Sequence, residues 1–238
     1  MPSVQIVTCP DTNDGSAGTV ASSTGATLTA GNFVACWVMW ADSGSVTVSG
    51  VTDGTNALAA ITTKTGPDAN GQSVQLWGKQ NVTAVASPVF TATFSVASTF
   101  RRIIWNERSS IAASSAVNDS KQNTSSTFGT GTNAVTSTNG AGTSVANCEI
   151  VALGYDSTSA TSMTAGTAPN TYTKRNTTTR SAGDSYDLED GVQAAAGAND
   201  AGTFTTTAGT DAIHVHMVAL APLIAAGGVS KLTLLGVT

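Results

Sequence analysis

The chain has 238 residues, of which 11% are charged, and its ten Lys and Arg residues leave a formal net charge of −5. Amphipathic helices need long charged side chains opposite an apolar stripe, so this composition predicts an all-β protein with Thr and Ser on its outer faces. Phosphate binding needs clustered cations, and no cluster exceeds a pair such as Arg101-Arg102, so we expect no nucleic-acid partner.

The first half of the chain alternates short β-type segments with turn signals. Residues 33–40 are apolar throughout, which predicts a central strand buried on both faces. Residues 101–107 place Ile103 and Trp105 on one face of a strand and Arg102, Ile104 and Asn106 on the other. Further strands are expected at residues 4–8, 46–49, 58–63, 74–77 and 89–95.

The second half is poorer in signals, and no helix can be placed in the Ser, Thr, Gly, Ala and Asn of residues 109–147. Residues 148–155 and 212–221 are apolar runs that predict buried strands, with weaker strands at 171–173, 186–192 and from Phe204 onward. The total of about ten strands has the spacing typical of a β-sandwich.

The length suits a single sandwich domain, which we place at residues 1–222, with a short C-terminal arm at residues 223–238. Four residues of the arm, Leu232, Leu234, Leu235 and Val237, are predicted to dock on a partner, because exposed apolar surface costs about 25 cal/mol per Å². The predicted mode is strand addition to the sheet edge of another chain. Residues 1–6 lack the pattern of a secretory signal and no run is long enough to cross a bilayer, so we expect a protein made soluble in a cytoplasm, with no membrane partner.

The order of several segments carries a resemblance. Ala30-Gly31-Asn32 leads into residues 33–38, and the further segments are 51–57, 74–82, 89–95, 150–155, 170–172 and 215–222. Together they resemble a jelly-roll module of phage structural proteins, over roughly residues 18–222. The resemblance implies a jelly-roll-like β-sandwich in a virion, as a capsid decoration or cement protein, a head fibre or a tail-fibre domain that binds surface sugars. It transfers no active residues.

Two groups of side chains invite a metal interpretation. His214 and His216 would share one face of a strand, but further ligands are not placed nearby, so a packed or hydrogen-bonded pair is favoured. The densest acidic group consists of Asp184, Asp187, Glu189 and Asp190. Asp187 and Glu189 would share the outer face of a strand whose inner face holds Tyr186 and Leu188. Calcium-loop spacing is absent, so a solvated strand edge is the favoured interpretation. Asp11, Asn13 and Asp14 are explained by a turn.

The remaining candidates are aromatic residues and thiols. Core packing is favoured for the tryptophans Trp37, Trp40, Trp77 and Trp105, although Trp77 or Trp105 would serve a sugar site if exposed. Cys9, Cys36 and Cys148 have no metal-type spacing and are predicted to be buried free thiols. With no nucleophile elbow, acid pair or phosphate loop, we assign no catalytic, cofactor or metal residue.

These observations favour a non-enzymatic virion protein that decorates or cements the capsid as a homo-oligomer, expected to be a trimer, through contacts with the major capsid protein or other virion proteins. The alternative is a tail-fibre or receptor-binding module that recognises host-surface glycans through loops at one end of the sandwich. A fibre would usually add a coiled-coil or repetitive shaft, and the chain has no heptads. A polysaccharide-cleaving enzyme ranks third.

Overall fold

The computed structural model describes residues 3–10, 14–125, 133–137, 141–157, 163–166, 170–179, 184–197, 200–206 and 213–223. Within these ranges the chain forms sixteen β-strands and no helix. Accordingly, this part of the chain has no helix that is long and apolar enough to cross a membrane. The prediction of an all-β fold is confirmed.

The first eight strands build one curled antiparallel sheet with the order β1-β8-β3-β6-β5-β4-β7-β2. Their bounds are β1 Ser3–Thr8, β2 Ala17–Ala21, β3 Phe33–Ala41, β4 Val48–Thr52, β5 Ala57–Ala60, β6 Gln72–Lys79, β7 Thr91–Ser98 and β8 Arg102–Arg108. The pairing is nested, because β1 pairs with β8, β2 with β7, β3 with β6 and β4 with β5. One core cluster draws side chains from both halves of this sheet, so the halves pack face to face.

The later strands build two further sheets. Their bounds are β9 Val117–Ser125, β10 Asn133–Thr136, β11 Cys148–Asp156, β12 Thr164–Ala165, β13 Thr173–Thr179, β14 Ser185–Gln193, β15 Thr203–Thr206 and β16 Ile213–Leu220. The order β13-β14-β11-β16-β9 forms a five-stranded antiparallel sheet, and β10-β15-β12 forms a small three-stranded sheet.

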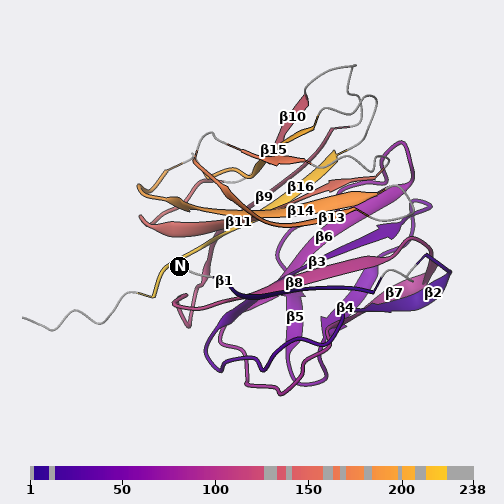
Figure 1. The fold of residues 1–238 in the computed structure, drawn as a ribbon, viewed down its shortest axis with the longest axis horizontal. Coiled ribbons are helices and arrows are strands. Elements are labelled where there is room, and N and C mark those ends of the chain that lie inside the picture. The colour runs from indigo at the N-terminus through magenta and orange to yellow at the C-terminus, as the bar shows by residue number, and fades with distance from the viewer. Residues whose placement is uncertain are drawn as a thin grey trace, which may run out of the picture.

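The sheets are stacked in layers, with the three-stranded sheet at one end and the β5-β4-β7-β2 half of the large sheet at the other (Figure 1). A second core cluster joins β3, β6 and β8 of the large sheet to β11, β14 and β16 of the five-stranded sheet. A third cluster joins the other face of the five-stranded sheet to Phe204 of β15. The five-stranded sheet is therefore covered on both faces.

Strand β3 shows why residues 33–40 are apolar throughout. Alternate side chains enter the first cluster (Val34, Cys36, Val38, Trp40) and the second cluster (Phe33, Ala35, Trp37, Met39). Because β3 lies between β6 and β8, neither face nor edge reaches water. Burying a large apolar side chain contributes about 1.5–3 kcal/mol, so this strand anchors two layers at once. The predicted central strand is confirmed.

Strand β8 alternates as predicted, with Ile103 and Trp105 in the first cluster and Ile104 in the second. The polar residues on the face of Ile104 are also buried, because the five-stranded sheet covers them. Arg102 and Arg108 are each 0% exposed. The interface between the two large sheets therefore contains charged groups at the start and at the end of β8.

Candidate functional site

All four tryptophans lie in the core, as favoured by the sequence. Trp37, Trp40 and Trp105 are 0% exposed and Trp77 is 8% exposed. The alternative prediction, a sugar site on an exposed Trp77 or Trp105, is therefore wrong. The three cysteines are buried thiols outside any disulfide among the described residues, as predicted. Burial raises the pKa of the Cys148 thiol to about 11 and that of Cys36 further still, so both sulfurs stay protonated and unreactive at neutral pH.

The acidic group on β14 is not a solvated edge, and this interpretation is corrected. Asp184, Asp187, Glu189 and Asp190 are all at most 5% exposed. Asp184 and Asp190 pair with arginines of the large sheet, whereas Glu189, on the other face of β14, bonds to the backbone at the three-stranded sheet. Tyr186 and Leu188 do point into the second cluster, as expected.

Each acid of this group has a partner. Four of the chain's cations serve three of the carboxylates, in the pairs Arg102–Asp184, Lys174–Asp187, Arg108–Asp190 and Arg175–Asp190. Glu189 instead accepts hydrogen bonds from the backbone N–H groups of Gly166 and Thr203, at 2.9 Å each. Burial raises the pKa of Glu189 to about 8 despite these bonds. The group is a structural network inside the stack.

The two histidines form a buried hydrogen-bonded chain rather than a metal site. The chain runs in order through Thr62, His216, Thr65, His214 and Asp68, with distances of 2.8, 2.7, 2.8 and 2.9 Å between successive polar atoms. Both histidines are on β16 and the other three residues are on the loop between β5 and β6. The chain therefore ties the large sheet to the five-stranded sheet, and the predicted hydrogen-bonded pair is confirmed.

Burial, reinforced by His214, holds the pKa of His216 well below its usual value, so this ring is neutral. Burial alone would raise the pKa of Asp68, but its hydrogen bond with His214 and the backbone N–H of Gln72 bring the pKa below the usual value. In the described ranges, no group of three or more His, Cys, Asp or Glu side chains could hold a metal ion. Asp11 and Asn13 lie outside those ranges, and Asp14 pairs with Arg102 at 2.5 Å.

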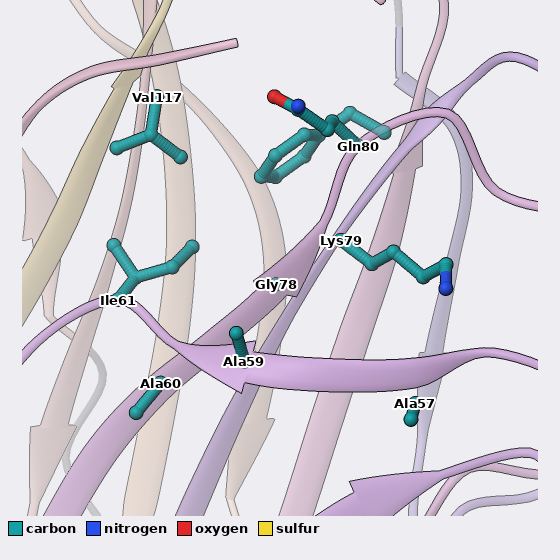
Figure 2. A pocket seen from close by; sticks show the side chains of 9 residues that line it. Ala57, Ala59, Ala60, Ile61, Gly78, Lys79, Gln80 and Val117 are labelled. Carbon is teal, nitrogen blue, oxygen red and sulfur yellow. The ribbon is translucent and has the colours of Figure 1, made fainter. Parts of the chain in front are cut away.

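One candidate site is an apolar groove of about 480 Å³ where β5 diverges from β6. Phe33 and Gly78 form its floor, and a Cβ atom on Gly78 would lie only 2.5 Å from the Ile61 side chain, so glycine keeps this floor open. Figure 2 shows Ile61 and Val117 on one side and the Lys79 side chain running along the other. Lys79 makes no ion pair with any described residue. The groove can accept an apolar segment.

A second candidate site is a smaller cleft of about 180 Å³ between the large sheet and the five-stranded sheet. It is lined by Asn70, Gln72, Phe100, Tyr155, Ser157 and Asp184. These residues come from the start of β6, the turn before β8, the end of β11 and the start of β14, so four strand ends converge there. The cleft combines one exposed aromatic ring with amide, hydroxyl and carboxylate groups.

The predicted docking residues Leu232, Leu234, Leu235 and Val237 lie outside the described residues, which end at Leu223. Leu223 is 58% exposed, and Ala221 donates its backbone N–H to the carbonyl of Ala116, next to Val117 of the apolar groove. The described chain therefore ends close to that groove.

Comparison with known protein families, with curated proteins and with solved structures finds no match to this chain.

Proposed function

We propose that this protein is a non-enzymatic structural component of a phage virion that decorates or cements the capsid. The observation that carries the proposal is the nested pairing of β1 to β8. In it β4, β5 and β6 are successive neighbours and β7 returns to lie beside β4, which is a Greek-key order. We assign these eight strands to the jelly-roll class, in which two Greek keys form two facing sheets and which includes viral capsid domains. The step from fold to virion is an analogy.

The charged groups that form buried ion pairs between the sheets support a structural role for the protein. The ion pairs of Arg102, Arg108 and Lys121 are buried between layers, and the His214–Asp68 contact is buried as well. Groups that hold sheets together in this way are not free to exchange protons with a substrate. The described charges thus favour a rigid module over an enzyme.

We further propose that the protein forms a trimer in which residues 230–237 of one copy occupy the apolar groove of a neighbour. That segment contains Leu232, Leu234, Leu235 and Val237, and the groove is lined mostly by apolar groups. Residues 224–229 link Leu223 to this segment and can span up to about 20 Å when extended, so the groove of the neighbour must lie within that distance of Leu223. Covering the groove removes apolar surface of both copies from water.

The test of this docking compares two exposed valines. Val117→Asp places a charge in the groove, and Val192→Asp places the same charge three strands away in the five-stranded sheet, at about 14 Å for a spacing of about 4.8 Å. We expect Val117→Asp and deletion of residues 224–238 to convert a species of about 71 kDa, three chains of 23.7 kDa, into monomers. Val192→Asp keeps the trimer.

Light scattering after size exclusion measures the mass, and co-sedimentation with particles assembled without this chain measures capsid attachment. A wild-type monomer at micromolar concentration would contradict the trimer. Wild-type protein that remains in the supernatant would contradict the capsid role.

A second candidate function is recognition of host-surface glycans, and one observation favours it. The cleft beside Phe100 lies at one end of the packed sheets, where loops meet, and it presents an aromatic ring together with hydrogen-bonding groups. The same class of fold includes lectin domains. Binding of purified protein to a panel of immobilised glycans tests this function independently of the capsid.

A further inference from the structure

The cleft beside Phe100 has a polar inner end whose hydrogen-bonding capacity is not used up. Gln72 is 7% exposed, Asp184 is 5% exposed and Tyr155 is 1% exposed, and all three line the cleft. The Nε2 amide of Gln72 makes no hydrogen bond with any described residue, and Gln72 lines the cleft, where solvent or a ligand can reach it. An amide donor that no protein group uses can bond to an acceptor of a ligand that enters the cleft.

The hydroxyl of Tyr155 leaves a second place for a ligand. Its oxygen is 3.4 Å from Oε1 of Gln72 and 3.4 Å from Oδ2 of Asp184. Typical O–H···O bonds are about 2.7–2.8 Å, so both contacts are long. One hydroxyl hydrogen serves one acceptor at a time. Asp184 already pairs with Arg102, so a hydroxyl that donates to Asp184 leaves Oε1 of Gln72 for a donor from a ligand.

The outer end of the cleft is an aromatic ring held in place by its backbone. Phe100 is 42% exposed and has a φ of 47°, in the left-handed region that few residues other than glycine adopt. Strain of this kind persists where the surroundings impose it, and it is often found at binding sites. The ring offers an apolar face at the mouth of an otherwise polar cleft.

The loop that carries Asn70 and Gln72 is already organised. The Oδ1 atom of Asp68 accepts hydrogen bonds from the backbone N–H groups of Asn70 at 2.8 Å and Gln72 at 2.9 Å. The side chain of Asn70 donates to the hydroxyl of Ser157 at 3.0 Å. A site whose polar groups are fixed before binding loses less conformational entropy when the ligand arrives.

Size and charge narrow the ligand class. The cleft of about 180 Å³ holds about six waters at about 30 Å³ each, which is comparable to one sugar ring with its hydroxyls. Asp184 is the one charged residue among those that line the cleft, and no cation lines it. Anionic ligands are therefore disfavoured.

We propose that the cleft between Phe100 and Tyr155 binds a single neutral pyranose ring, with Phe100 stacked on the apolar face of the sugar and Gln72, Tyr155 and Asp184 bonded to its hydroxyls. The inference rests on the second candidate function, to which it gives a place and a ligand class. It is independent of capsid attachment.

The test uses the full chain, methyl glycosides of neutral hexoses and the methyl glycoside of sialic acid as the anionic probe. Saturation-transfer NMR detects contact, and titration gives the dissociation constant. Phe100→Asn keeps a residue that tolerates the left-handed backbone but removes the ring, and Gln72→Met keeps the volume but removes the amide. Each is expected to weaken binding of a neutral hexose about tenfold or more, which corresponds to about 1.4 kcal/mol.

Two matched variants control for indirect effects. Phe100→Tyr retains the ring and is expected to bind within about twofold of wild type, since the aromatic face is unchanged. Val96→Asn removes another exposed apolar side chain, which is 55% exposed on β7, and is expected to leave binding unchanged. Thermal unfolding of each variant verifies that the protein is folded.

The outcomes separate the site from the function. Neutral-hexose binding that survives both Phe100→Asn and Gln72→Met would overturn this site while leaving glycan recognition in place. The absence of binding to any neutral hexose, on the glycan panel and in NMR, would overturn both. A preference for the sialic acid glycoside would overturn the ligand class.

Discussion

Arg108 offers the sharpest test of how the two large sheets are held together. Its guanidinium is 0% exposed, and its Nη1 atom lies 2.7 Å from Oε1 of Glu149 and 2.5 Å from Oδ2 of Asp190. The variant Arg108→Met removes the cation and keeps an apolar stem. Asp190 retains Arg175, but Glu149 is buried and loses the only described side chain with which it forms an ion pair.

Removing one partner of a buried ion pair costs about 3–5 kcal/mol of unfolding free energy, because the other charge stays uncompensated. For a chain of this length, that loss lowers the melting temperature by about 6–20 °C. The matched control is Arg175→Met, whose side chain is 40% exposed, so that loss of its ion pair with Asp190 is expected to cost less than about 1 kcal/mol. Urea denaturation of both variants measures the difference.

The pH dependence supplies a second readout. Burial raises the pKa of Glu149, and Arg108 counteracts that shift. Without Arg108 the pKa of Glu149 rises further, so the folded state binds a proton that the unfolded state has already lost, and stability falls as pH increases above the ordinary pKa of 4.5. The cost of Arg108→Met is therefore larger at pH 8 than at pH 5. A cost no greater than that of Arg175→Met, or one equal at both pH values, would refute the reasoning.

Three further predictions concern single positions. Gly154→Ala places a Cβ atom 2.6 Å from the ring of Phe204 and should lower the free energy of unfolding by about 1–3 kcal/mol. Gly50→Ala, whose Cβ would have nothing within 4 Å, should lower it less. Equal urea midpoints for the two variants would contradict this. The pKa of Glu189 is about 8 in the folded state and 4.5 ordinarily, so the free energy of unfolding should fall by up to about 5 kcal/mol as the pH rises from 4.5 to 8. Denaturation at several pH values should show a weaker pH dependence for Glu189→Gln. Because the pKa of His216 is lowered, stability should fall below about pH 6.5 by up to about 1.4 kcal/mol per pH unit, and an unchanged acid slope in His216→Gln would count against this.

The buried strands could be predicted from the sequence because their signal is local. An uncharged apolar run such as residues 33–40 requires two buried faces, and the two-residue alternation in residues 101–107 assigns each side chain of β8 to a face. The acids of β14 could not be placed in this way. The two-residue alternation assigns Tyr186 and Leu188 to the core face, but the sequence does not show that the three-stranded sheet lies against the face of Glu189.

The positions of two cations in the sequence indicate that the acids near β14 are buried. Charged residues are scarce in this chain, and Lys174 and Arg175 lie on β13, next to β14. In a chain with few charges, acids and bases on neighbouring strands are more readily explained as buried pairs than as solvated edges.

Neither the apolar groove nor the cleft beside Phe100 can be predicted from a short segment of the sequence. The apolar groove depends on Phe33, Gly78 and Val117, which are far apart in the sequence and meet only through sheet packing. Phe100 lies in a turn before β8, and nothing in its neighbours indicates a left-handed backbone or an exposed ring. Such sites are set by tertiary contacts, which composition and periodicity do not encode.

The most direct test of the virion proposal is cryo-electron microscopy of phage particles assembled in the presence of this chain, compared with particles assembled without it. The account predicts three-fold clusters of density on the capsid surface that fit the stacked sheets and are missing from the second sample. Identical capsid maps, with density for this chain at no position on the head, would contradict the capsid role.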